Sequence, residues 1–447
     1  MKFISNSNDL SMYLNIPVKK NIEIRSFSTD TRCIKKEDLF IAIKGEMFNG
    51  NHYVESALKK GACLVIADDK RFRDSKNKKI IYVRDSILAL KKISKNIIKE
   101  YSGNIIGITG SNGKTTTTKI IANSLKSSSS TLKNFNNEIG MPLSIISANK
   151  KSKNLIIEMG AAKPNDIHYL SSILKPKIGI ITNIGNSHLK SLKNIRGVFK
   201  VKSELIPNIK KNGCLVLPDE NKDHLKLWKN IRNDINIITF GLQNSADFYP
   251  SNIEYNLNKT KFYICSQKYK VKIKINTALA GEHNIKNILA SFAASFFLNN
   301  PNELFIESLT KNLDLIINRQ KQSKWIKGSL LIDDTYNANP DSVKKSIDLL
   351  TSTNKRKVLV LGDMLELGRF KKKMHKDIGV YAALKKIDIF LGFGDLTKYS
   401  VKSFGKKGFF FKSEDDLRKY IKKNINSKDV VLLKGSRGMK MERFINV

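Results

Sequence analysis

Cysteine, proline and tryptophan are scarce in this chain of 447 residues, which has 4 Cys, 9 Pro and 2 Trp. No two cysteines are close enough in sequence for the CxxC or CxxxC spacing of a zinc site, so we expect neither a structural metal nor a disulfide framework. The chain also has 41% hydrophobic residues and only 25 Gly, which excludes a disordered or collagen-like protein. The thiols are Cys33, Cys63, Cys214 and Cys265.

Long hydrophobic runs are missing as well. The longest nearly apolar run covers residues 288–298, well below the roughly 18 residues of a membrane span. Residues 1–16 are interrupted by polar side chains and have no apolar core of a secretory signal. We therefore expect a cytoplasmic protein that does not attach to a membrane.

Acidic residues are few relative to basic ones, with 40 Asp+Glu against 80 Lys+Arg and a net charge of +40. Such an excess is typical of proteins that bind nucleic acid or an anionic membrane. Here the lysines are scattered as doublets such as Lys19-Lys20 and Lys385-Lys386 among many Asn and Ile, as an AT-rich coding sequence would produce. We favour this compositional origin and expect no nucleic-acid partner, with a polyanion-binding surface as the alternative.

Strand-like and helix-like segments alternate along most of the chain, which predicts an α/β fold with largely parallel sheets. Short apolar runs at 104–109, 155–158, 178–182 and 214–217 read as buried strands, and residues 248–275 alternate as an antiparallel sheet would. The βα pattern starts again after residue 312. We predict three domains: 1–99, 100–312 with a P-loop-type parallel sheet, and 313–447 with a Rossmann-like sheet.

The strongest local signal is a glycine-rich turn at residues 110–116, between a predicted strand and a predicted helix. It reads Gly110, Ser111, Asn112, Gly113, Lys114, Thr115 and Thr116, a shortened form of the Walker pattern. Glycines allow the backbone N–H groups and the helix N-terminus to face a phosphate, Lys114 adds a positive charge, and the Thr115 hydroxyl can ligate Mg²⁺. This segment predicts a nucleotide phosphate site.

Three other polar residues are ambiguous when each is considered alone. Glu158 ends a buried strand, where it is as easily a structural capping residue as a metal ligand. His188 follows another strand and is more often a packed or surface histidine in such a place. Lys202 lies in a helical stretch and, alone, reads as one more solvated lysine.

Taken together, these motifs resemble those of the ATP-dependent Mur ligases of peptidoglycan synthesis. The likeness covers the whole length and is closest to the members that add D-alanyl-D-alanine, whose motifs at 134–143 and 333–340 it shares. The shared segments are 28–32, 38–45, 134–143, 158–161, 281–284, 333–340, 361–368 and 434–437.

The resemblance implies a role for individual residues. The turn at 110–116 would bind ATP, with Lys114, Glu158, His188 and Lys202 carrying the chemistry and Lys202 present as a carbamate. The implied Mg²⁺ ligands are Thr115, Glu158, His188 and Lys202. The implied further nucleotide contacts are Asn284, Asn287, Arg319, Asp334, Tyr336 and Asn337, and the implied substrate contacts are Ser28, Arg32, Asn49, Gly50, Asn136 and Asn137.

The implied reaction joins D-alanyl-D-alanine to UDP-N-acetylmuramoyl-tripeptide through an acyl phosphate, with ATP and Mg²⁺, in a protein that we expect to be a monomer. Two alternatives remain: a Mur ligase that adds the third peptide residue, and a polyanion-binding P-loop ATPase. The chain departs from the family pattern at Ile317-Asn318, where Pro-Gly is usual, and at Lys190, where a glutamate is common.

Overall fold

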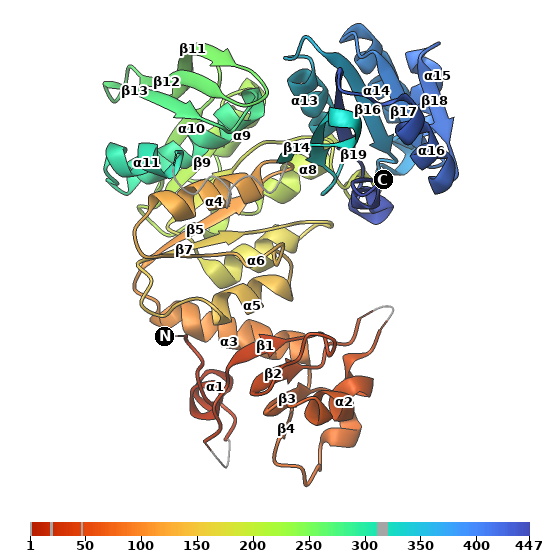
Figure 1. Ribbon diagram of the computed structural model, residues 1–447. Helices are drawn as coiled ribbons and strands as arrows, with labels where there is room; N and C mark the ends of the chain where they lie inside the picture. The colour runs from red at the N-terminus through yellow and green to blue at the C-terminus, as the bar shows by residue number, and fades with distance from the viewer. Residues whose placement is uncertain (1, 18–20, 46–47, 311–320) are drawn as a thin grey trace.

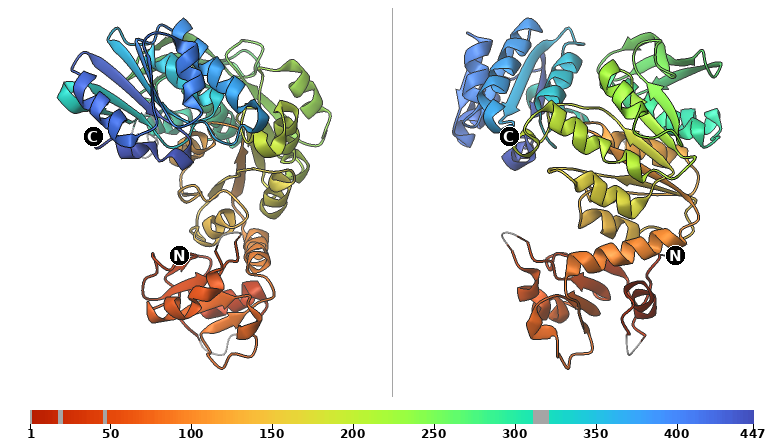
Figure 2. Two further views of the ribbon diagram at one scale, coloured as in Figure 1. Left: turned by 90° about the vertical axis from the view of Figure 1, so that its right-hand side faces the viewer. Right: turned by 180° about the vertical axis from the view of Figure 1, so that it is seen from behind.

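The computed structural model describes residues 2–17, 21–45, 48–310 and 321–447. Three domains follow one another along the chain (Figure 1). The N-terminal domain lies at one end, the domain with the nucleotide loop lies in the middle, and the C-terminal domain packs beside the far end of the middle one. The same order is visible from the side and from behind (Figure 2). The α/β prediction is confirmed.

The N-terminal domain is a four-stranded parallel sheet in the order β1-β2-β3-β4. Asp85 caps helix α3, because its side chain accepts a hydrogen bond from the Leu88 N–H. The helix buries an apolar stripe at 3–4-residue spacing against the middle domain. The elements are α1 (Ser7–Leu14), β1 (Ser26–Ser28), β2 (Asp38–Ile41), α2 (Val54–Lys59), β3 (Leu64–Ala67), β4 (Ile80–Tyr82) and α3 (Ser86–Glu100).

The middle domain contains a six-stranded parallel sheet in the order β10-β9-β8-β5-β7-β6. Its central strands are buried on both faces, which explains their continuous Ile, Leu and Val runs. The strands are β5 (Asn104–Thr109), β6 (Ser128–Ser130), β7 (Asn154–Glu158), β8 (Ile178–Ile181), β9 (Cys214–Pro218) and β10 (Asn236–Phe240). The helices are α4 (Lys114–Ser124), α5 (Gly140–Ile146), α6 (Asp166–Leu174), α7 (Leu189–Leu192), α8 (Ile195–Ser203), α9 (Lys222–Lys229), α10 (Glu282–Phe297) and α11 (Asn302–Ser308).

The alternating pattern of residues 248–275 predicted an antiparallel sheet, and the middle domain has a small antiparallel sheet there. Its strands are β11 (Tyr249–Tyr255), β12 (Thr260–Ser266) and β13 (Val271–Thr277), in that order. Phe248, Phe262 and Ile264 join its inner face to the core around α4 and α10.

The C-terminal domain has a six-stranded sheet in the order β14-β15-β19-β16-β17-β18, with only β14 antiparallel. Helices cover both faces, as in other Rossmann-like sheets. The elements are β14 (Lys321–Lys324), β15 (Leu330–Asp334), α13 (Pro340–Leu350), β16 (Arg356–Gly362), α14 (Lys371–Leu384), β17 (Ile389–Phe393), α15 (Thr397–Phe404), β18 (Gly408–Phe411), α16 (Glu414–Asn424) and β19 (Asp429–Lys434).

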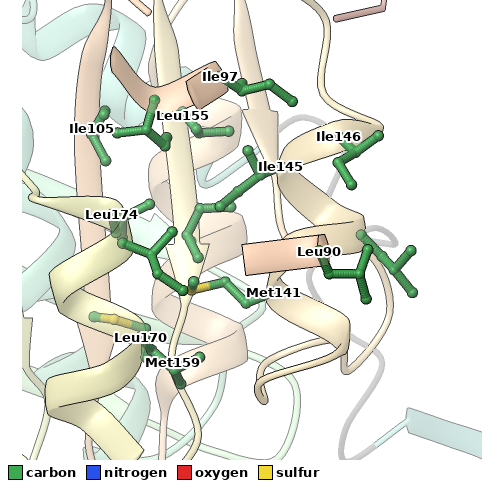
Figure 3. Packing of buried hydrophobic residues seen from close by; sticks show 14 of the residues in the cluster. Leu90, Ile97, Ile105, Met141, Ile145, Ile146, Leu155, Met159, Leu170 and Leu174 are labelled. Carbon is green, nitrogen blue, oxygen red and sulfur yellow. The ribbon is translucent and has the colours of Figure 1, made fainter. Parts of the chain in front are cut away.

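One continuous core joins the N-terminal helices to the middle sheet. Leu90 and Ile97 of α3 lie beside Met141 and Ile145 of α5, and Leu155 of β7 packs against the same cluster (Figure 3). These side chains are buried, so the two domains share packing instead of being joined by a bare linker. No helix in the described ranges is both long and apolar enough to cross a membrane.

We expect Leu155→Ala to lower the free energy of unfolding by about 2–5 kcal/mol, because it opens a cavity between β7 and the helices on it. Thermal and urea unfolding monitored by circular dichroism measure the change. Ile253→Ala, at a side chain that is 41% exposed, is the control and should change stability little. Equal effects of the two substitutions would contradict this packing.

Candidate active site

The nucleotide loop links β5 to α4 at the carboxyl edge of the middle sheet. Gly110 has φ +145° and Gly113 has φ +83°, and a Cβ at these positions would lie 1.9 Å from Thr182 Oγ1 and 2.2 Å from Asn287 Oδ1. Only glycine fits both positions without displacement of these side chains. No side chain caps the start of α4, and the positive end of the helix dipole lies at this loop, where it favours an anion.

Glu158 lies beside this loop, at the end of β7, with only 3% of its surface exposed. Its Oε2 accepts a hydrogen bond from Thr115 Oγ1 at 2.8 Å, and its Oε1 accepts one from Asn136 Nδ2 at 2.7 Å. Both donors are neutral, so the carboxylate can still take a cation. These oxygen donors suit Mg²⁺, which also takes oxygens from water and nucleotide phosphates.

No group of three or more His, Cys, Asp and Glu side chains suited to a metal ion occurs within the described ranges. The four expected ligands therefore do not form a ready-made cage. Thr115 and Glu158 are in direct contact, and Lys202 is close enough to Glu158 to be influenced by its charge. A third oxygen from a carbamate on Lys202 would complete an oxygen-rich set, so the residues present fit the ion.

Lys202 is buried in α8, with 1% of its surface exposed, so the interpretation of a solvated lysine is wrong. Burial, helped by the positive charge of Lys114, lowers the pKa of Lys202 to about 7. The opposing effect of Asp166, Glu204 and Glu158 is smaller. A substantial fraction of the side chain is therefore a neutral amine near neutral pH, the form that can react with CO₂.

His188 lies at the end of the loop after β8, in the left-handed region with φ 52°. Its Nδ1 is 2.6 Å from Oε2 of Glu366, which belongs to the C-terminal domain, and this hydrogen bond lowers the pKa of Glu366. Lys190 stands where the family pattern led us to expect a glutamate. A carboxylate is nevertheless present near His188, and it comes from another domain.

Asp334 ends β15 and is held in place by neighbours. Its Oδ2 accepts hydrogen bonds from Ser346 Oγ at 2.7 Å and from Nζ of Lys434, a buried residue at the end of β19. Lys434 also donates to the Asn337 carbonyl at 3.0 Å. The sequence reasoning assigned no role to Lys434. Lys434 could have been found from the sequence, because it is a polar residue at the end of an apolar strand. The same pattern drew attention to Glu158.

A cavity of about 1020 Å³ brings most of the predicted residues together, and all three domains line it. The N-terminal domain contributes Asp85, Ile87 and Leu88. Gly110 and Lys202 are buried and do not line the cavity, and Arg319 falls outside the described residues. The predicted residues that line the cavity are Ser111, Asn112, Gly113, Lys114, Thr115, Thr116, Asn136, Asn137, Glu158, His188, Asn284, Asn287, Asp334, Tyr336 and Asn337.

Four predicted substrate contacts do not line this cavity and lie within the N-terminal domain. Arg32 has 86% of its side chain exposed and pairs with Asp30, whose carbonyl accepts from Ser28 Oγ at 2.9 Å. Asn49 caps a short 3₁₀ helix. Packing alone explains why residue 50 is a glycine, because a Cβ there would lie 2.6 Å from the Ile43 nitrogen.

Comparison with known proteins identifies the family to which this arrangement belongs. Three family models match: the Mur ligase family catalytic domain at residues 23–98, the Mur ligase middle domain at 108–295, and the Mur ligase glutamate ligase domain at 319–437. Together they span most of the chain. The chain belongs to the Mur ligase family.

Within that family, the chain is similar to UDP-N-acetylmuramoyl-tripeptide–D-alanyl-D-alanine ligases. It is 33% identical to the one from Buchnera aphidicola subsp. Baizongia pistaciae, over 99% of this chain and 96% of the relative, and 32% identical to the one from Bacillus subtilis, over 96% and 94%. A crystal structure of MurF from Acinetobacter baumannii superimposes with a TM-score of 0.87 at 25% identity, over 98% of this chain and 97% of that one. MurF ligase from Thermotoga maritima in complex with ADP gives 0.80 at 28% identity, over 94% and 96%.

We expect Gly113→Ala to weaken ADP binding by about tenfold or more, because the added Cβ collides with Asn287 and moves the loop that faces the phosphates. Isothermal titration calorimetry with ADP measures the loss. Gly405→Ala is the matched control, since Gly405 also has a positive φ, +103°, but no atom within 4 Å of the added Cβ. Equal ADP affinity of the Gly113 variant and the wild type would contradict the assignment.

Proposed function

We propose that this chain is the ATP-dependent ligase that joins D-alanyl-D-alanine to UDP-N-acetylmuramoyl-tripeptide. The observation that carries the proposal is the cavity that all three domains line, which contains the nucleotide loop and a buried carboxylate. The names of the relatives supply the substrates, since similarity covers nearly the full length of both chains. The product is the UDP-linked muramoyl-pentapeptide of peptidoglycan synthesis.

With boundaries near residues 100 and 312, each of the three domains has its own role in this proposal. Domain 1–99 holds the UDP end of the substrate, domain 100–312 binds ATP, and domain 313–447 completes the cavity beside the nucleotide. A single chain supplies all three walls, which favours a monomer. The use of ATP and a UDP-linked precursor favours the cytoplasm as its place of work.

The reaction begins when the terminal carboxylate of the tripeptide attacks the γ-phosphorus of ATP, and ADP leaves. The amine of D-alanyl-D-alanine then attacks the carbonyl carbon of the acyl phosphate, and inorganic phosphate leaves as the amine loses its proton. Two anions meet in the first step, so positive charge must be present. Lys114 supplies it from the loop, and the N-terminus of α4 adds its dipole.

Thr115, Glu158, His188 and the carbamate of Lys202 are the residues that we propose to hold magnesium. The ion, when bound, neutralises phosphate charge and aligns the reacting groups. Asn136 keeps the Glu158 carboxylate oriented through its 2.7 Å hydrogen bond. Asn284 and Asn287, joined by a 3.2 Å hydrogen bond, face the adenine, while Asp334, Tyr336 and Asn337 contact the nucleotide from the C-terminal domain. The family resemblance assigns the same role to Arg319, which lies outside the described residues.

Contacts to the UDP-linked substrate come from two places in this proposal. Asn136 and Asn137 lie in the cavity, where the tripeptide carboxylate must approach ATP. Ser28, Arg32, Asn49 and Gly50 belong to the surface that holds the UDP end, and the exposed guanidinium of Arg32 is available to a phosphate.

A phosphate-release assay across UDP-muramoyl peptides and amine acceptors tests the substrate assignment. We expect release with the tripeptide plus D-alanyl-D-alanine and little with either alone. Release with UDP-N-acetylmuramoyl-dipeptide plus diaminopimelate or lysine, but not with the first pair, would favour the ligase that adds the third residue. Release that needs only nucleic acid would favour the polyanion-binding ATPase.

Carbamylation of Lys202 makes a separate prediction about pH. The neutral amine becomes tenfold rarer for each pH unit below a pKa of about 7, so activity dependent on the carbamate should fall below pH 7 and recover with added bicarbonate. Turnover measured from pH 6 to 8, with and without bicarbonate, reports this dependence. A profile without any response to bicarbonate at low pH would count against the carbamate.

Substitution of Lys202 gives the complementary test. We expect Lys202→Ala to lose most activity, about 100-fold or more, and a small carboxylic acid to restore part of it by supplying the missing oxygen ligand. Lys200→Ala, at an exposed lysine two residues earlier in α8, is the control and should keep wild-type activity. Full activity of Lys202→Ala without added acid would refute the role.

A further inference from the structure

The loop after β8, residues 183–190, is bound to the nucleotide loop by several hydrogen bonds. Asn183 Oδ1 accepts from the Asn112 N–H at 3.0 Å, and Asn183 Nδ2 donates to the Asn112 carbonyl at 3.1 Å. Ser111 Oγ donates to the Gly185 carbonyl at 3.0 Å and accepts from the Gly185 N–H at 2.9 Å. These four hydrogen bonds join the nucleotide loop to loop 183–190, so a shift of one loop disturbs the other.

The C-terminal domain holds this loop at a first point through Asp341, in the first turn of α13. The Asp341 carboxylate accepts the Asn186 N–H at 2.6 Å and the Asn186 side-chain amide at 3.2 Å. The fit is tight, since a Cβ on Gly185 would lie 2.5 Å from Asp341 Oδ2. Both donors are neutral and the acceptor is a carboxylate, a combination that gives hydrogen bonds stronger than average.

A second point of contact lies at the other end of the loop, in the segment 361–368 whose motif has so far received no role. Glu366 pairs with His188 at 2.6 Å, and its backbone carbonyl accepts the Lys190 N–H at 2.9 Å. Glu366 has φ 61°, and the neighbouring Gly368 lies against Lys190, where a Cβ would come within 3.1 Å of the Lys190 Cα. The segment is thus shaped to lie directly on the loop.

We propose that Asp341 and Glu366 are positioning residues, which together hold loop 183–190 against the nucleotide loop when the C-terminal domain is docked. Neither residue lies in the nucleotide loop, and each acts through a residue of the middle domain. The inference rests on the proposed function, because it assumes that residues 110–116 bind ATP. It adds that docking of the C-terminal domain sets the geometry of the nucleotide site in the middle domain.

A third contact from the C-terminal domain binds the nucleotide loop directly and supports the same proposal. Asn339 caps α13 by accepting the Ser342 N–H at 2.8 Å, and its Nδ2 donates to Asn112 Oδ1 at 2.8 Å. The cap fixes the first turn of α13, and this turn presents both Asn339 and Asp341 to the middle domain. The two carboxylates of Asp341 and Glu366 thus bind loop 183–190, and the Asn339 amide binds the nucleotide loop at the Asn112 side chain.

Hydrogen exchange followed by mass spectrometry tests the proposal without a need for turnover. With ADP and Mg²⁺ bound, we expect peptides covering 183–190 to exchange about tenfold faster in Asp341→Ala and in Glu366→Ala than in the wild type, since a hydrogen bond to a charged group is worth that order. The kcat/KM for ATP should fall about tenfold in the same variants. Asp341→Asn and Glu366→Gln keep an acceptor and should restore both quantities to within about threefold.

Asp415→Asn is the matched control, because Asp415 is an exposed carboxylate on α16, in the same domain but away from the contact. It should leave exchange and kcat/KM unchanged. Asn186→Ala removes the side-chain partner of Asp341, so its effect should not add to that of Asp341→Ala. Melting temperatures, and exchange of the outer helix α16, establish whether each variant is folded.

Wild-type exchange at 183–190 and wild-type kcat/KM in both folded alanine variants would overturn the proposal. So would additive effects of Asn186→Ala and Asp341→Ala. Failure of the proposed function is separate: in that case ADP would leave exchange at 110–116 unchanged in the wild-type protein itself. Protection at 110–116 together with unaltered exchange at 183–190 in the variants would reject only the positioning roles.

Discussion

The site depends on two ionisable side chains, Glu158 and Lys202, that the protein buries at one edge of the middle sheet. Glu158 and Lys202 are 3% and 1% exposed, and removal of either charge from water is costly unless a partner compensates for it. The donors Thr115 and Asn136 that bind Glu158 are neutral, and burial pushes Lys202 toward its neutral form. The carbamate proposed for Lys202 would add a second anion near Glu158, and a divalent cation between the two would compensate both.

The sheet edge explains why the same few positions carry the chemistry. In a parallel sheet the carboxyl ends of all strands meet at one edge, so the ends of β5, β7 and β8 bring the nucleotide loop, Glu158 and loop 183–190 together. The C-terminal sheet repeats the arrangement, with Asp334 and Lys434 at the ends of adjacent strands. Two such edges face one cavity, and the substrates must enter between them.

Much of this could be predicted from the sequence because the signals are local. Continuous apolar runs predicted the buried strands, and the Gly110–Thr116 pattern predicted a phosphate loop, since glycine spacing determines backbone shape directly. The burial of Lys202 could not be predicted, because α8 has lysines on both its exposed and its buried side and only packing distinguishes them. The contacts of Asp341 and Glu366 also escaped prediction, because their partners lie about 155 and 180 residues away, beyond any local pattern.

The net charge of +40 has a different meaning once the cavity is known. ATP and a UDP-linked peptide are both polyanions, so a broadly positive surface speeds their encounter without a dedicated patch. Inside the cavity, acidic side chains are no longer outnumbered two to one by basic ones. The groups that line or border its centre include Glu158, Asp334 and Glu366 besides Lys114, and Lys202 is predicted to lose its positive charge. The positive surface thus attracts the anionic substrates at long range. The centre of the cavity keeps enough negative charge to bind a divalent cation. Such an ion can align two anions in a way that freely moving lysines cannot.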